Sequence, residues 1–345
     1  MSNPKWFDDN SNVGWLRISD VTEQKGRIHH LSQRISKAGQ SKTRVIIEPH
    51  LLLSIAATVG SPVINYVNTG VHDGFLIFLN PTFDKEFMFQ WLLMFKPYWN
   101  KYGQPGSQVN LNSDIVGNQS IAFPTTSEQE RIANFFSELD TAITLHEEKK
   151  RQLECLKSAL LQKMFANKNG YPAVRFEGFD KAWKQSKLGE ITKVIASKPY
   201  ISTPSTHGNY LVIQQGDKPI AGFSNSNPFK NYNNITLFGD HTLSLFKPRS
   251  PFLVASDGIK ILSPSIEMNG LFYFYELEKY KPKSEGYKRH FTILKKCKAN
   301  FPTDIDEQKL IGSLLLRIDN LITKQQLKMD KLNETKESLL QNMFI

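Results

Sequence analysis

The clearest pattern of apolar and polar positions occurs twice, once near the middle of the chain and once at its end. Residues 123–165 and 301–344 both open with Phe-Pro-Thr and continue without another proline. Apolar side chains then recur in steps of four and three, which predicts a long helix that needs a partner helix. The predicted helix-pairing residues are Ile132, Phe136, Leu139, Ile143, Leu153, Leu160, Ile311, Leu315, Ile318, Ile322, Leu332 and Leu339.

The two helical segments are copies of each other. From Glu128 and Glu307 onward, identical residues stand at a constant offset of 179, as Asp140 and Asp319 do. Each predicted helix therefore has the other copy as its simplest partner. About forty residues at a rise of 1.5 Å predict rods about 60 Å long. An antiparallel pairing would make the chain pseudo-two-fold symmetric.

Polar residues interrupt both seams at matching places. His146 stands where the second copy has Gln325, and Lys157 stands where it has Lys336. Polar seam positions can fix the register of a helix pair, so we interpret His146 as structural rather than as a ligand. We interpret Lys157 and Lys336 as solvated positions at which the seam loosens.

The segments between the helices are rich in glycine, proline, asparagine and aromatic residues, and turn signals separate short strand-like runs. These runs include Val45–Ile47, Phe75–Leu79, Tyr210–Gln214, Ile259–Leu262 and Phe272–Tyr275. Residues 73–81 resemble residues 257–264, so the globular parts are repeated as well. We expect an α/β (α+β) fold with two globular domains separated by two long antiparallel coiled-coil helices. The predicted divisions are residues 1–124, 125–167, 168–302 and 303–345.

The charge balance is basic, with 43 Lys and Arg against 33 Asp and Glu, for a net charge of +10. Such an excess favours a polyanionic partner such as nucleic acid, although a merely basic soluble protein remains an alternative. The two cysteines, Cys155 and Cys297, are isolated, which argues against a metal site and suits a reducing cytosol. The N-terminus is polar, and the apolar run Phe87–Phe95 is too short to span a membrane. These features predict a cytoplasmic protein with no membrane partner.

Sequence motifs for catalysis are missing. The segment Asn227-Pro228-Phe229 lacks the second proline of an adenine methyltransferase loop, and no glycine-rich loop for ATP occurs. Glu334-Thr335-Lys336 mimics part of a nuclease motif but lies on a predicted helix without a partner carboxylate, so we interpret it as surface charge. The sequence therefore predicts no catalytic residues and no bound cofactor or metal.

Several motifs resemble the specificity subunit of type I restriction–modification enzymes. Both repeats carry Phe-Pro, then Glu-Gln, and then a helix that ends in Leu-Leu-Gln-x-Met-Phe. Trp183 and Lys187-Leu188-Gly189-Glu190 resemble the opening of a target recognition domain in that family. Pro172-Ala173-Val174-Arg175-Phe176 resembles the usual lead into that opening.

The resemblance implies that each globular domain is a target recognition domain that reads one half of a split site on double-stranded DNA. The helices would set the spacing of the halves and dock modification (methyltransferase) subunits, and through them restriction (translocase and nuclease) subunits. The complete enzyme would use S-adenosylmethionine, ATP and magnesium, none of which this subunit is expected to hold.

The first domain departs from the family pattern. In the second domain, Trp183 precedes Tyr210 by 27 residues. Trp15 is the residue of the first domain that matches Tyr210, and only 14 residues precede it. No Lys-Leu-Gly counterpart precedes Trp15. We therefore expect the first domain to be N-terminally shortened and to lack its opening strand.

Lysine, arginine and glutamine side chains in predicted loops are the candidates for DNA contact, because they bind phosphates and base edges. The candidates are Arg17, Arg27, Arg34, Lys37, Lys42, Arg44, Lys101 and Gln108 in the first domain and Lys198, Gln214, Gln215, Lys218, Lys230, Arg249, Lys260, Lys288 and Arg289 in the second. The alternative for each is a solvated surface residue. Two other functions remain open, a self-contained enzyme and a coiled-coil scaffold that joins proteins without reading DNA.

Overall fold

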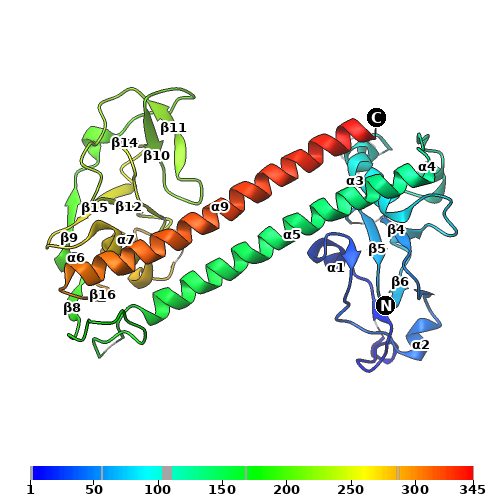
Figure 1. Cartoon of the computed structure of the whole chain (residues 1–345), viewed down its shortest axis with the longest axis horizontal. Helices are drawn as coiled ribbons and strands as arrows, with labels where there is room; N and C mark the ends of the chain where they lie inside the picture. The colour runs from blue at the N-terminus through cyan, green and yellow to red at the C-terminus, as the bar shows by residue number, and fades with distance from the viewer. Residues whose placement is uncertain are drawn as a thin grey trace. The chain divides into compact units, whose positions relative to one another are not determined.

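The computed structural model describes residues 3–55, 57–102, 111–167, 169–284, 286 and 288–344 (Figure 1). The chain divides into two compact units. Unit 1 comprises Met1–Glu147 and Leu327–Ile345, and unit 2 comprises Glu148–Gln326. Helices α5 (Thr126–Lys163) and α9 (Ile305–Met343) therefore each contribute one end to each unit.

Within its described residues, unit 1 contains two small sheets, with strand orders β1-β6-β3 and β2-β5-β4-β7. Its elements before α5 are η1 (Pro4–Trp6), β1 (Gly14–Trp15), α1 (Ile18–Glu23), β2 (Arg27–Ile28), α2 (Lys37–Gln40), β3 (Arg44–Ile46), β4 (Leu51–Ser54), β5 (Pro62–Asn65), β6 (Thr69–Val71), β7 (Phe75–Ile77), α3 (Lys85–Phe95), η2 (Lys96–Tyr102) and α4 (Ser113–Gly117).

The described part of unit 2 contains three sheets, with strand orders β11-β10-β14, β13-β12-β15-β9 and β16-β8. Its elements between the long helices are β8 (Lys184–Lys187), α6 (Leu188–Ile191), β9 (Thr192–Ile195), η3 (Lys198–Tyr200), β10 (Tyr210–Ile213), β11 (Ile220–Ser224), β12 (Thr236–Gly239), β13 (Leu245–Phe246), β14 (Phe252–Val254), β15 (Ile259–Pro264), α7 (Gly270–Tyr280), α8 (Phe291–Leu294) and β16 (Lys298–Phe301).

The two units share a common core of strands, although the third strand of the three-stranded sheet differs, because β3 pairs with β6 whereas β11 pairs with β10. The pair β1 and β6 is parallel, as is the pair β10 and β14. Strand β4 lies between β5 and β7, just as β12 lies between β13 and β15. A helix of 11 residues follows β7 in unit 1 and β15 in unit 2, namely α3 and α7. The mixed α/β fold with repeated domains and long helices is therefore confirmed.

The run Phe272–Tyr275 was expected to be strand-like, and that prediction is wrong because the run lies inside α7. The Asn269 side chain accepts hydrogen bonds from the backbone of Leu271 and Phe272 and so caps the helix. The aromatic residues have high strand propensity, but burial of one helical face outweighs it. That face includes Phe272, Tyr273 and Leu277.

The glutamine of the Glu-Gln motif has the same structural role in both units. Gln129 Oε1 accepts from the backbone N–H of Asp84, the N-cap of α3, while Gln129 Nε2 donates to the carbonyl of Pro124. Gln308 makes the same two bonds, to Asn269 and Pro302 in unit 2, at 2.7 Å each. A glutamine at this position thus joins the long helix to the shorter helix of its unit.

The long helices run antiparallel within each unit. In unit 1, the ring of Phe136 on α5 packs against Phe344, with centroids 6.0 Å apart, and Asp140 one turn later contacts Lys336. In unit 2, Lys157 of α5 contacts Asp319 of α9. All twelve predicted helix-pairing residues are buried or half-buried. Within the described ranges, no helix is long and apolar enough to cross a membrane.

Unit 1 lacks counterparts of two unit 2 strands among the described residues. In unit 2, β9 extends the sheet beyond β15, and β8 pairs with β16 immediately before α9. In unit 1, β7 forms the edge of its sheet, and the segment before α5 that corresponds to β16 contains no strand. The units therefore differ at the position of the opening segment.

Candidate nucleic-acid interface

Each unit has a hollow at its surface, and in unit 1 this hollow lies beside the turn between β6 and β7. In unit 1 the hollow has a volume of about 960 Å³, and Trp6, Trp15, Lys42, Arg44 and His72 are among its lining residues. The side chains of Lys42 and Arg44 are exposed. Burial lowers the pKa of His72, so its imidazole is neutral near pH 7 and the positive charge of the hollow comes from Lys42 and Arg44.

The hollow of unit 2 is smaller, about 260 Å³, and lies beside the turn between β10 and β11. Gln215 holds this turn, because its Oε1 accepts from the backbone N–H of His241 at 3.1 Å. Gly216 donates to Ser244 Oγ at 3.0 Å. The exposed Gln214 donates from Nε2 to the carbonyl of Lys218 at 2.9 Å. The turn is therefore fixed while Gln214 and Lys218 remain at the surface.

A second basic loop of unit 2 is anchored by Asp240, which is 3% exposed. The Asp240 carbonyl accepts from the backbone N–H of His290, and its Oδ1 accepts from the backbone N–H of Phe291. Lys260 lies 3.7 Å from the Asp240 carboxylate and offsets its charge. These bonds position Lys288 and Arg289, both exposed, immediately before the buried His290.

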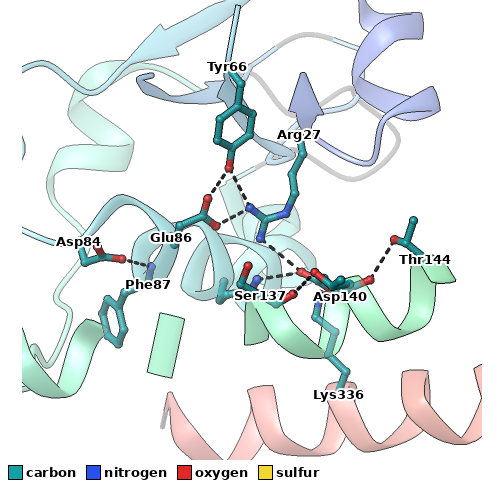
Figure 2. A network of polar contacts seen from close by, with 11 residues as sticks. Arg27, Tyr66, Asp84, Glu86, Phe87, Ser137, Asp140, Thr144 and Lys336 are labelled. Atoms are coloured by element: carbon teal, nitrogen blue, oxygen red, sulfur yellow. Dashed lines mark hydrogen bonds and ion pairs between the residues drawn. The ribbon is translucent and has the colours of Figure 1, made fainter. Parts of the chain in front are cut away.

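Equivalent ion-pair clusters join the long helices to each unit. In unit 1, Asp140 of α5 contacts Lys336 of α9 and Arg27 of β2 (Figure 2). Asp140 also accepts a hydrogen bond from Gln90 of α3 at 3.1 Å. Arg27 also pairs with Glu86. Burial and a hydrogen bond to Glu86 raise the pKa of Tyr66 to about 12, so the phenol stays protonated (Figure 2).

The cluster of unit 2 uses the matching helix positions, but there a lysine of α5, rather than an aspartate, lies between two opposite charges. Lys157 of α5 lies 2.9 Å from Asp319 of α9 and 2.8 Å from Glu278 of α7. Tyr275, at the α7 position that matches Gln90, donates to Asp319 at 2.7 Å. Burial alone would lower the pKa of Lys157, but Glu278 and Asp319 outweigh it and raise that pKa.

The comparisons with known proteins identify the fold. The family model of the type I restriction modification DNA specificity domain matches the chain twice, over residues 2–155 and 180–332. The chain belongs to this family. The structure is similar to the type I restriction-modification system S subunit from M. genitalium, with a TM-score of 0.63 and 14% identity, covering 100% of this chain and 92% of that one.

A second similar structure carries the description "structural basis underlying complex assembly and conformational transition of the type I R-M system". Its TM-score is 0.53 at 17% identity, covering 95% of this chain and 90% of that one. The family assignment confirms the predicted DNA sequence-specificity subunit without a catalytic centre of its own. Among the described residues, no group of His, Cys, Asp and Glu could hold a metal ion.

The structure of this specificity subunit divides the predicted DNA-contact residues into groups. The exposed ones are Arg34, Lys37, Lys42, Arg44, Lys101, Lys198, Gln214, Lys218, Lys230, Arg249, Lys288 and Arg289. Lys42 and Arg44 line one hollow, and Gln214 lines the other. Lys101 instead lies over the rings of Phe95 and Tyr102, and Arg249 donates to Asn320 on α9. Gln108 lies outside the described residues.

Other predicted contacts are used within the fold. Arg17 pairs with Asp20 at the start of α1, and the Lys260 ammonium donates to the carbonyl of Asp257. Gln215 holds its turn. Arg27 is 19% exposed and bound to two carboxylates, so we do not retain it as a DNA contact. Its commitment to the ion-pair cluster is the physical reason.

The interpretation of Lys157 and Lys336 as solvated is wrong. Their side chains are only 17% and 14% exposed, and both are ion-paired across the helices. The sequence contained a usable signal, because Asp140 and Asp319 stand at the same offset as the two lysines. Because both helices carry an aspartate and a lysine at repeated positions, the sequence predicts that the lysine of each helix pairs with the aspartate of the other.

Proposed function

We propose that each unit of this specificity subunit reads one half of a split DNA target and directs partner subunits to that site. The observation that carries the proposal is the double match to a DNA specificity domain, over residues 2–155 and 180–332. Two copies of one reading domain in a single chain suit a target with two halves. The domain boundaries we propose for reading are residues 1–124 and 168–302, with the helices between them.

We place the first half-site contact at Lys42 and Arg44, which combine exposure, positive charge and a hollow with aromatic walls. The second contact involves Gln214, Lys218 and Arg289, which neighbouring hydrogen bonds hold in defined loops. Such residues supply phosphate contacts and base-edge hydrogen bonds. Arg34, Lys37, Lys198, Lys230 and Lys288 are further phosphate contacts in this proposal.

Modification subunits would dock on the long helices, and restriction subunits would join through the complex. Both helices carry exposed apolar side chains that the fold itself does not bury, including Leu145 and Leu156 on α5 and Leu321 and Leu327 on α9. We propose that the partner subunits bury these leucines. The partner subunits would bring S-adenosylmethionine, ATP and magnesium with their own catalytic domains.

The test maps methylated adenines in DNA from cells that carry this subunit and its modification partner. We expect one motif with two defined halves. The double variant Lys42→Ala/Arg44→Ala should weaken selection of one half only, while Lys149→Ala, an exposed lysine on α5, should leave the motif unchanged. A motif with a single defined half would contradict reading by both units.

A further inference from the structure

In unit 2, a groove between α7 and the start of α9 is filled by the segment that follows α5. Trp183 in this segment is 5% exposed, and its ring packs against Phe165 and Phe272, with centroids 6.1 and 5.9 Å away. The Glu307 carboxylate, 1% exposed, accepts hydrogen bonds from Arg175 at 2.8 and 2.9 Å and from Trp183 Nε1 at 3.2 Å. The segment continues as β8, which pairs antiparallel with β16 (Figure 1).

Unit 1 has the same groove. Phe344 packs against Phe87 with centroids 5.1 Å apart, as Phe165 packs against Phe272 at 5.5 Å. Glu128 stands at the helix position of Glu307. The groove has a volume of about 930 Å³, and its lining includes Phe87, Glu128, Phe344 and the segment 120–123, which corresponds to β16.

The described part of unit 1 contains nothing equivalent to the covering segment. Phe123 is 47% exposed, whereas the matching Phe301 is 6% exposed. The Glu128 side chain is exposed, whereas Glu307 is buried against an arginine and a tryptophan. Residues 120–123 form no strand, whereas β16 has a partner. An apolar floor, a carboxylate and a segment without a strand partner thus all line this one groove.

We propose that this groove of unit 1 binds, in trans, an extended segment of a separate polypeptide with the chemistry of residues 172–187. That chemistry is an arginine that pairs with Glu128, a tryptophan eight residues later that packs on Phe87 and Phe344, and a following strand that pairs with residues 120–123. Strand addition supplies backbone hydrogen bonds, and the charged and aromatic side chains supply specificity.

A second copy of this chain is the weaker occupant. Its own matching segment is already bound in its unit 2 through Arg175 and Trp183. Moving that segment to another groove would first break these hydrogen bonds, so the exchange yields little net free energy. A separate polypeptide with a free segment forms the equivalent hydrogen bonds without breaking any of its own. The proposal does not depend on DNA reading, and its test contains no DNA.

The probe is a fluorescent synthetic peptide with the sequence of residues 170–191, titrated with the full chain and followed by anisotropy. We expect saturable binding at one peptide per chain. Glu128→Gln should weaken binding by about tenfold or more, because it removes a charge-assisted hydrogen bond. Glu130→Gln, an exposed glutamate two residues along the same helix, is the matched control and should bind normally.

Two further measurements assign the site. A peptide with alanine in place of Arg175 and Trp183 should not bind, and hydrogen exchange should slow at residues 120–123 when the intact peptide is present. Absence of saturable binding, equal affinity of Glu128→Gln and Glu130→Gln, or protection confined to β16 would each overturn the proposal. Self-association without peptide that Glu128→Gln abolishes would also overturn it, because a second copy would then be the occupant.

Discussion

The two interhelical clusters should respond to neutralisation in opposite order. In unit 1, one carboxylate, Asp140, serves two cations, Lys336 and Arg27. In unit 2, one cation, Lys157, serves two carboxylates, Asp319 and Glu278. The residue that stands alone against two opposite charges should be the costlier one to lose. We therefore expect Asp140→Asn to destabilise more than Lys336→Met, but Lys157→Met to destabilise more than Asp319→Asn.

The magnitudes follow from partial burial. Exposed ion pairs contribute about 0.2–1 kcal/mol, whereas breaking a buried pair costs about 3–5 kcal/mol. Asp140 and Lys157 are 24% and 17% exposed, between these limits. We expect about 2–3 kcal/mol for removal of either one. Lys336→Met should cost about 1 kcal/mol, because Asp140 keeps Arg27 and Gln90 and methionine preserves the apolar stem.

The assay is urea unfolding followed by tryptophan fluorescence and by hydrogen exchange. Four of the five tryptophans lie in unit 1 and only Trp183 lies in unit 2, so fluorescence reports mainly on unit 1 and exchange must report on unit 2. Lys331→Met, at an exposed position of α9, is the control and should change stability by less than about 0.5 kcal/mol. The reasoning fails if the lysine is the costlier residue in both units, or the aspartate in both.

Three further predictions concern single sites. Glu276 is fully buried without a hydrogen-bond partner among the described residues, and burial raises its pKa. The folded chain therefore binds a proton that the unfolded chain releases, so stability falls as pH rises above the ordinary glutamate pKa, by up to about 1.4 kcal/mol per pH unit. Glu276→Gln should remove this slope in urea unfolding, whereas the exposed Glu267→Gln should keep it. Gln308→Ala should cost about 2–3 kcal/mol in the same assay. The Gln308 side chain is 1% exposed, and its loss leaves two buried backbone groups without their hydrogen-bond partner. Lys42→Ala/Arg44→Ala should lower the slope of log affinity for duplex DNA against log salt by about 2, and an unchanged slope would exclude phosphate contacts there.

The repeated architecture could be predicted from the sequence because its two signals, the apolar seam and the proline at each helix start, are periodic or local. The seam from Ile132 to Leu160 repeats on the second helix, and proline marks both helix starts. The structure places α5 at Thr126–Lys163 and α9 at Ile305–Met343, close to these limits. Helical periodicity can be recognised from the sequence alone because all residues of the seam lie on the same side of their helix.

The polar contacts were harder to predict than the architecture, because they join residues far apart in the chain. Arg27 looked like a DNA contact by residue type, but its partners Glu86 and Asp140 lie on α3 and α5. No local pattern indicates that β2 faces those helices. Lys42 and Arg44 had the same residue-type signal and remain exposed. Residue type therefore selects candidates, and only tertiary packing separates a surface cation from a structural one.

The Glu-Gln motif shows how duplication can preserve one residue's role and leave its neighbour's role open. Gln129 and Gln308 each use both ends of the amide within their own unit. The glutamates differ, because burying a carboxylate without a cation is costly and, in the part of the chain that the structure describes, only Glu307 of the two is bound to an arginine. Glu128 is exposed, so its carboxylate remains solvated and avoids that cost. A segment that covered Glu128 without supplying a cation would bury an unpaired charge, so the groove should discriminate against apolar segments that otherwise fit its floor.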